Sequence, residues 1–366
     1  MSGLKKIVIK LGTSTLTKGT LNLSRPAMLE VARQVSELHG RGVEIVLVTS
    51  GALSAGREVI PEYKQDKSVP SKQMLCSVGQ VRLMEIWTEL FGLYDIHVGQ
   101  ILLTRSDFSN REPYLNIRDT LHAMLDHRIL PICNENDPVA NKKSLVGDND
   151  NLGAFIANMI AADLFVILTD QKGLYDKDPR TNPDAKLISI VKTINDEVVE
   201  AAKDTSTKLG TGGMATKIEA AQLASHSGTP TEITSMSVPD VLLKLAKGEM
   251  AGTRFAATES TRESRKRWLL SEKSKGKVVV DPGAAQKLKT GGASLLPIGI
   301  TATGGKFDRG ALIQISKNGK VLGVGISNYS SAEIEKIKKT HSEKIEEVLG
   351  YTFGPEVIHR DNMVIL

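Results

Sequence analysis

Acidic and amide side chains cluster on either side of residue 140. Directly after the apolar run 129–133, and directly before the apolar segment 152–162, the chain places Asn134, Glu135, Asn136, Asp137, Asp148, Asn149, Asp150 and Asn151. An unpaired carboxylate is costly to bury, so groups packed this densely need cations, a metal ion or a ligand. Turn and helix-cap chemistry explains one or two of them. The cluster therefore predicts a binding site.

Three turns with glycine and hydroxyl side chains predict anion binding. Lys10 follows the apolar residues 7–9 and precedes Gly12. Ser50-Gly51 precedes a helical segment, and the glycine-rich stretch 208–217 precedes another. Glycine lets backbone N–H groups approach a phosphate, a helix N-terminus favours the anion, and Lys10 and Lys217 add charge. Taken alone, Lys10 fits a solvated strand end equally well. No Gly-x-x-x-x-Gly-Lys-Ser/Thr motif occurs, which excludes a Walker A loop.

Apolar segments with the periodicity of strands or of helices must position these residues. Strands are predicted at 6–10, where a Gly-Thr-Ser turn follows, and at 43–48, 97–104, 129–133 and 164–169. Helices are predicted at 26–41, 53–59, 72–91, 114–126, 152–162 and 218–225. Such alternation is typical of an α/β fold with a largely parallel sheet, whose ligands bind at the carboxyl ends of the strands. The polar segment 61–70 is predicted to be a loop near that edge.

Composition sets the broad class. The chain has 366 residues, enough for two or three domains, with 40% hydrophobic and 24% charged residues. A net charge of +5 suits anionic small substrates and nucleic acid alike. Cys76 and Cys133 lie in apolar surroundings and predict reduced core thiols in a cytoplasmic protein. The N-terminus lacks a signal-peptide pattern, and no apolar stretch is long enough for a membrane span.

Motifs along most of the chain resemble the amino-acid kinase family. They lie at residues 8–14, 48–57, 97–105, 134–137, 146–151, 168–175 and 209–214. The pair Asn-Glu-Asn-Asp at 134–137 and Gly-Asp-Asn-Asp-Asn at 147–151 is similar to members that phosphorylate glutamate in proline biosynthesis, rather than aspartate, acetylglutamate, carbamate or UMP. The resemblance implies a three-layer αβα sandwich with a mainly parallel sheet, and a reaction that uses ATP and Mg²⁺.

The same resemblance implies roles for individual residues. Lys10 and Lys217 would offset charge during phosphoryl transfer, and Asp150 would hold both ammonium groups. Ser50 and Gly51 would bind a carboxylate of glutamate, while its α-ammonium group would contact Asn134, Asp137, Asp148 and Asn149. The ATP site would comprise Lys10, Gly12, Thr169, Asp170, Thr211, Gly212, Gly213, Met214, Ala215, Thr216 and Lys217. No metal site built from side chains is expected.

Further expectations concern partners. The resemblance implies feedback inhibition by proline around the glutamate site, with loop 61–70 as the element that adapts to proline. It also implies a homo-oligomer (dimer or tetramer) and a glutamyl-phosphate reductase that receives the product.

One departure from the family lies at 228–235, where Pro230 and Glu232 predict a weak strand on the nucleotide side of the sheet.

The C-terminal part is predicted to be a separate domain. We expect a catalytic domain at 1–258, a charged linker at 259–274 and a module at 275–366 with short strands at 277–280, 299–301, 312–315 and 321–326 and a charged helix at 331–349. Segments 294–300 and 307–310 resemble the PUA domain, a small β-barrel-like module of RNA-modifying enzymes. The alternative function is therefore an RNA-binding or RNA-modification-associated protein. The phosphate loops before residue 258 argue against it, and the mixed charges of 331–349 favour a regulatory or structural role.

Overall fold

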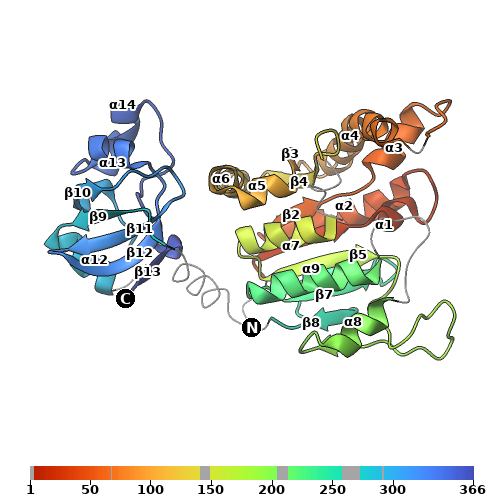
Figure 1. Cartoon of the computed structure of the whole chain (residues 1–366). Helices are drawn as coiled ribbons and strands as arrows, with labels where there is room; N and C mark the ends of the chain where they lie inside the picture. Colours follow the sequence, from red (N-terminus) through yellow and green to blue (C-terminus); the bar gives the residue numbers. More distant parts are fainter. Residues whose placement is uncertain (1–3, 67, 141–148, 204–212, 258–272, 291) are drawn as a thin grey trace. The chain divides into compact units, whose positions relative to one another are not determined.

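The computed structural model describes residues 4–66, 68–140, 149–203, 213–257, 273–290 and 292–366. By their internal contacts, Met1–Ser109 and Ile117–Thr261 form one compact unit, and Asn110–Asn116 and Arg262–Leu366 form a second (Figure 1). Most of the predicted linker 259–274 lies outside the described residues, so the domain boundaries stay a prediction. None of the described helices is long and apolar enough to cross a membrane.

An eight-stranded sheet forms the centre of the first unit. Its order is β3 (Val98–Leu103), β4 (Leu130–Glu135), β2 (Glu44–Val48), β1 (Lys6–Leu11), β5 (Leu164–Thr169), β7 (Thr231–Ser235), β8 (Thr253–Phe255) and β6 (Ile190–Val191). Every neighbouring pair is parallel except β7 and β8. The carboxyl ends of β1, β2, β4 and β5 therefore meet at one edge, as the strand–helix alternation predicted.

Helices cover both faces of this sheet. Alternate residues of the central strands, such as Ile7 and Ile9, share one core cluster with residues of α2 (Arg25–Gly40), α4 (Val69–Gly92) and α10 (Val241–Ala246). The opposite face carries α7 (Asn149–Met159) and α9 (Met214–His226), which lie side by side in Figure 1. The remaining helices of the catalytic part are α1 (Thr13–Thr17), α3 (Ala52–Val59), α5 (Arg105–Ser109), α6 (Arg111–Asp126) and α8 (Asp196–Lys203). The predicted three-layer α/β sandwich is thus confirmed.

The prediction of a weak strand at 228–235 was wrong. Strand β7 is an interior strand, paired with β5 on one side and β8 on the other. Pro230 precedes it and uses only its carbonyl oxygen, which accepts a hydrogen bond from Phe165 N at 3.0 Å. The fully buried carboxylate of Glu232 pairs with Arg254 and accepts a hydrogen bond from Ala251 N at 2.9 Å. A charge inside a strand is tolerated here because tertiary partners satisfy it.

The second unit is built on a five-stranded sheet. The order is β10 (Ile300–Gly304), β9 (Gly276–Val280), β11 (Leu312–Lys317), β12 (Lys320–Ile326) and β13 (Met363–Ile365). It has its own apolar core, to which α12 (Pro282–Thr290) and α13 (Ser331–Ile337) contribute. The three-residue 3₁₀ turns lie at Pro297–Gly299, Ser342–Lys344 and Arg360–Asn362.

The single helix predicted at 331–349 was wrong. Helix α13 ends at Ile337, and α14 (Ile345–Leu349) follows after the turn at Ser342–Lys344. Lys338 is extended (φ −53°, ψ 143°), Lys339 is left-handed (φ 62°), and the Lys339 N–H donates to Pro297 O at 2.9 Å. A long-range hydrogen bond therefore ends the helix where the charge pattern alone would continue it.

Candidate active site

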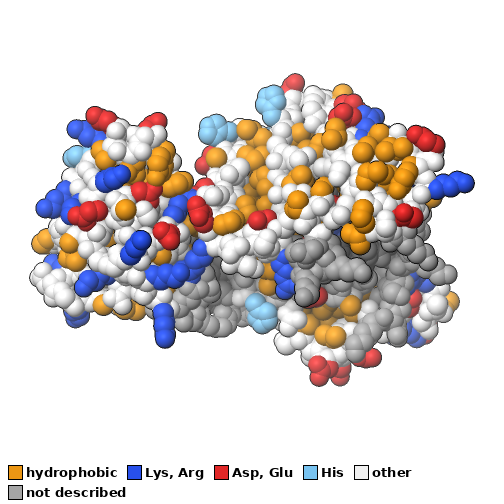
Figure 2. All heavy atoms as spheres, turned by 45° about the horizontal axis from the view of Figure 1, so that its top comes forward, with side chains coloured by type: hydrophobic (Ala, Val, Ile, Leu, Met, Phe, Trp, Pro, Cys, Tyr) orange, Lys and Arg blue, Asp and Glu red, His pale blue; other side chains and the backbone are white. Residues whose placement is uncertain are grey.

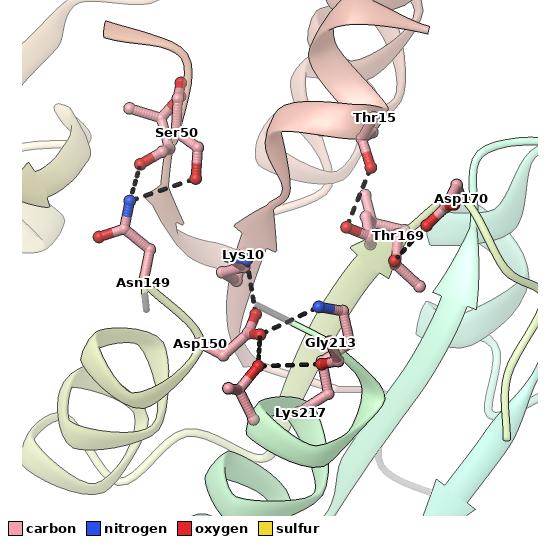
Figure 3. Close-up of polar contacts among 12 residues, drawn as sticks. Lys10, Thr15, Ser50, Asn149, Asp150, Thr169, Asp170, Gly213 and Lys217 are labelled. Carbon is pink, nitrogen blue, oxygen red and sulfur yellow. Dashed lines mark hydrogen bonds and ion pairs between the residues drawn. The ribbon is translucent and has the colours of Figure 1, made fainter. Parts of the chain in front are cut away.

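Two buried lysines share one buried carboxylate at the carboxyl edge of the sheet. Lys10 is the penultimate residue of β1, Asp150 lies in the first turn of α7, and Lys217 lies in the first turn of α9. The Asp150 carboxylate is 2.6 Å from Lys10 Nζ and 3.1 Å from Lys217 Nζ (Figure 3). These residues are 2%, 0% and 6% exposed, respectively. Two cations against one anion leave a net charge of +1, which suits an anionic ligand.

Helix N-termini add to this positive character. Helices α7 and α9 both begin beside Asp150, so the backbone N–H groups of their first turns and their positive dipole ends lie near the lysines. Thr216 Oγ1 of α9 contacts α7 by donating to Asp150 Oδ2 at 3.2 Å, and it lies 2.9 Å from Gly213 O at the start of its own helix (Figure 3). The arrangement can bind phosphate groups.

The neighbouring ends of β1 and β5 bring further predicted residues together. Gly12 N donates to Leu168 O at 3.2 Å, and Thr15 Oγ1 donates to the same carbonyl at 3.0 Å. Thr169 Oγ1 donates to Asp170 Oδ1 at 2.9 Å, with Thr169 buried and Asp170 exposed (Figure 3). These residues border the lysines because β1 and β5 are adjacent and in parallel register.

A chain of amide groups lies at the ends of β2 and β4. Asn149 Nδ2 donates to Thr49 O at 2.8 Å, Ser50 Oγ at 3.2 Å and Asn134 Oδ1 at 2.9 Å. Its oxygen Oδ1 is buried, has no hydrogen-bond partner among the described residues, and points away from Ser50 in Figure 3. Such an acceptor suits a hydrogen-bond donor on a ligand. Gly51, next to Ser50, is left-handed (φ 103°) and precedes α3.

Asp137 borders a pocket of about 230 Å³ beside this chain. The lining residues come from α4, β3 and the end of β4 and are Cys76, Ser77, Gln80, Val81, Gln100, Leu102, Glu135, Asp137 and Pro138. Burial raises the pKa of Asp137, and Lys72 acts in the opposite direction. Burial and the Asp137 carboxylate raise the pKa of Cys76 to about 12, so this thiol stays neutral. Cys133 is likewise buried and free.

The structure therefore brings most of the predicted residues to one edge of the sheet. Within its first turn α9 carries Met214, which is buried, and Ala215, which is exposed. Three predicted residues lie outside the described residues, namely Asp148, Thr211 and Gly212. The sequence reasoning missed two residues of α4: Gln73, whose Nε2 donates to Asp137 O at 3.2 Å, and Gln80, whose Oε1 accepts from Asn134 Nδ2 at 2.8 Å. Their spacing of seven residues, two helical turns on one face, was the available signal.

Comparison with known proteins defines the class of this chain. Residues 5–235 match the family model "Amino acid kinase family", and residues 276–349 match "PUA domain". A solved UMP kinase from Bacillus anthracis shares the fold, with a TM-score of 0.50 and 17% identity, covering 70% of this chain and 98% of that one. The chain therefore belongs to the amino acid kinase family, as the motifs predicted.

Similar proteins of named activity match over the full length. Glutamate 5-kinase of Pasteurella multocida (strain Pm70) is 46% identical over 363 residues, which is 99% of either chain. Glutamate 5-kinase of Shewanella pealeana (strain ATCC 700345 / ANG-SQ1) is 49% identical over 366 residues, covering 100% of this chain and 98% of the relative. Both parts of the chain thus have counterparts in single relatives of the same length.

Proposed function

We propose that this protein transfers the γ-phosphoryl group of ATP to the γ-carboxylate of L-glutamate, the first step of proline biosynthesis. A carboxylate oxygen forms a bond to phosphorus, the bond between phosphorus and the bridging oxygen of ADP breaks, and the products are L-glutamyl 5-phosphate and ADP. The observation that carries this proposal is the buried Lys10–Asp150–Lys217 cluster next to the amide chain. Relatives named glutamate 5-kinase, similar over the whole chain, support the choice of substrate.

The charge balance of the cluster fits this reaction. A carboxylate and a triphosphate repel each other, so catalysis depends on positive charge placed where the transferred group passes. Lys10 and Lys217 supply it, and Asp150 orients both ammonium groups through its two oxygens. The γ-carboxylate is already ionised at neutral pH, so no general base has to deprotonate it.

ATP would be bound by residues on the β5 and α9 side of the lysines. These are Gly12, Thr169, Asp170 and the stretch Thr211, Gly212, Gly213, Met214, Ala215, Thr216 and Lys217. Mg²⁺ bound to the phosphates would neutralise further charge, and it is usually held by phosphate oxygens with one or two carboxylates. Among the described residues, no group of three His, Cys, Asp or Glu side chains is placed to hold a metal ion.

Glutamate would be bound by residues on the β2 and β4 side. Ser50 Oγ and the backbone N–H of Gly51, at the start of α3, suit a carboxylate. The buried Oδ1 of Asn149 and the carboxylate of Asp137 are acceptors for the α-ammonium group, with Asn134 and Asp148 in support. The amino acid is thereby recognised at the end that does not react.

Proline carries the same carboxylate and ammonium pair as glutamate, so we propose that it competes at this site.

Exposed apolar side chains gather on the part of the first unit that faces the reader in Figure 2, and Val81 and Met74 of α4 are 63% and 40% exposed. This surface supports a homo-oligomer, dimer or tetramer. We also propose that the protein passes its labile product to a glutamyl-phosphate reductase. Its proposed location is the cytoplasm. RNA binding by the C-terminal unit is not favoured, because α13 and its C-cap residue mix both charges, as in the ion pair between Glu335 and Lys338.

Hydroxylamine trapping of the acyl phosphate, together with ADP release, tests the proposed reaction. The protein should need L-glutamate, ATP and Mg²⁺, and Lys10→Ala should abolish most of the hydroxamate signal. Aspartate and N-acetylglutamate are the competing acceptors. Turnover of either one far above that of glutamate would overturn the assignment, and ADP release that depends on RNA instead of glutamate would support the alternative function.

A further inference from the structure

The amide chain of the candidate site extends outward to helix α4. Asn134 Nδ2 donates to Gln80 Oε1 at 2.8 Å, and Gln80 Nε2 donates to Gln100 Oε1 at 3.2 Å. Asn134 Oδ1 accepts hydrogen bonds from Asn149 Nδ2 and from Glu135 N, both at 2.9 Å. Gln80 is thus bonded directly to Asn134 and is linked through Asn134 to Asn149. It also lines the pocket that Asp137 borders.

Backbone groups determine which way each amide points. The backbone N–H of Glu135 can only donate, so the Asn134 atom next to it must be the oxygen, and Asn134 Nδ2 must face Gln80. The Thr49 carbonyl can only accept, so Asn149 directs its nitrogen inward and its oxygen outward. Both assignments follow from groups whose roles cannot reverse, rather than from an arbitrary choice of amide orientation.

Gln80 supplies the acceptor for the nitrogen end of the Asn134 amide. Asn134 is only 2% exposed. A buried N–H group that loses its acceptor costs about 1–3 kcal/mol, so without Gln80 the Asn134 side chain would rotate toward another acceptor. That rotation would withdraw the Asn134 oxygen from Asn149 Nδ2 and leave the Asn149 amide held only by Thr49 O and Ser50 Oγ. The Asn149 oxygen would then be held less firmly toward the ligand.

We infer that Gln80 is a positioning residue for the amino end of the substrate, acting through Asn134 and Asn149. The inference rests on the proposed function, because it assigns the α-ammonium group of glutamate to the Asn149 oxygen. Gln80 does not contact the lysine cluster in any described interaction. Its loss should therefore weaken glutamate binding while leaving phosphoryl transfer and ATP binding nearly unchanged.

Gln80→Met tests this inference, because methionine has a similar length and offers no amide. We expect KM for glutamate to rise about tenfold, which corresponds to about 1.4 kcal/mol, with kcat and KM for ATP within about twofold of the wild type. Glutarate matches glutamate except for the amino group, so its inhibition constant as a competitor should also stay within about twofold. A general collapse of the pocket would instead weaken glutarate and glutamate together.

Two further variants complete the test. Gln80→Glu keeps an oxygen for Asn134 and should restore the ratio of glutamate KM to glutarate inhibition constant to within about threefold of the wild type. Ser77→Ala is the control, because Ser77 lines the same pocket. The variant loses only the hydrogen bond from Ser77 Oγ to Gln73 O of the same helix, which is 2.8 Å long, and it should leave both constants unchanged.

Several outcomes would overturn the inference. An unchanged glutamate KM in folded Gln80→Met would do so, as would a parallel loss of glutarate binding. If Gln80→Met does not fold, Gln80→Glu provides the test. A tenfold rise in its glutamate KM, with an unchanged glutarate inhibition constant, would also contradict the inference, because that variant keeps the acceptor for Asn134. A wild-type protein without glutamate-dependent activity would refute the proposed function itself, which is a separate result.

Discussion

Gly153 sets the distance between helix α7 and the sheet, and replacing it by alanine should separate Asp150 from Lys10. A Cβ atom added at Gly153 would lie 2.6 Å and 2.7 Å from two ring atoms of Phe165 and 3.5 Å from Lys10 Cβ. Carbon atoms normally approach to about 3.5–4.0 Å. Because Phe165 is fully buried in β5, its ring has little space to move, and α7 must shift by about 1 Å.

The size of the effect follows from the position of Asp150. It lies one turn before Gly153 on the same helix face, so a shift of about 1 Å would lengthen the 2.6 Å contact with Lys10 Nζ to about 3.6 Å. Misplacement of a catalytic group by about 1 Å can lower the rate about a hundredfold. Overpacking typically costs about 1–3 kcal/mol in stability. Gly153→Ala should thus lower kcat about a hundredfold and also lower Tm.

The assay combines kcat from hydroxamate formation with thermal unfolding. Gly92→Ala is the matched control, because an added Cβ there has no neighbour within 4 Å. It should keep kcat and gain up to about 1 kcal/mol in stability, as glycine is a poor helix former. The double variant Gly153→Ala with Phe165→Leu removes the ring and should recover kcat to within about fivefold, although Phe165→Leu lowers Tm by itself.

Two results would refute this reasoning. One is a folded Gly153→Ala variant with the kcat of the wild type, which would show that the cluster tolerates displacement of α7. The other is failure of the double variant to recover kcat while it remains folded. In that case the loss would come from the helix itself and not from contact with Phe165.

Four further outcomes are expected. Lys10→Ala and Lys217→Ala should each lower kcat about a hundredfold or more in the hydroxamate assay, because each removes preorganised charge from the transition state; a change confined to KM would contradict this. Asp137→Asn should raise KM for glutamate yet raise Tm at pH 7. Burial raises the pKa of Asp137 in the folded state, so the wild type loses stability as pH rises from the unfolded pKa of about 3.9 through the folded value. The difference in Tm should disappear near pH 3, and a lower Tm for the variant at pH 7 would count against it. Substitutions in loop 61–70 should raise the proline concentration needed for inhibition while glutamate turnover persists; a wild type indifferent to millimolar proline removes that idea. A chain ending at residue 274 should still phosphorylate glutamate, since every proposed site residue precedes residue 258, and complete loss of turnover in a folded truncated chain would show otherwise.

The sequence by itself determined the layers of the fold and the composition of the site. Strand–helix alternation predicted a parallel sheet, and parallel strands necessarily place their carboxyl ends, with Lys10, Ser50, Asn134 and Thr169, at one edge. The glycine-rich turns predicted helix N-termini for anions, because glycine and local hydrogen bonding act over a few residues. These features depend on near neighbours in the chain, and the residue pattern contains them directly.

Only the tertiary structure decided which groups meet and in which orientation. The buried carboxylate of Glu232 is tolerated in an interior strand because Arg254, 22 residues away, pairs with it. Helix 331–349 is interrupted because Lys339 donates to Pro297. Gln80 of α4 accepts a hydrogen bond from Asn134 of β4, 54 residues away, because the fold brings this helix to the end of that strand. Each of these contacts joins segments whose spacing in the chain says nothing of their spacing in the fold, so no local pattern could have predicted them.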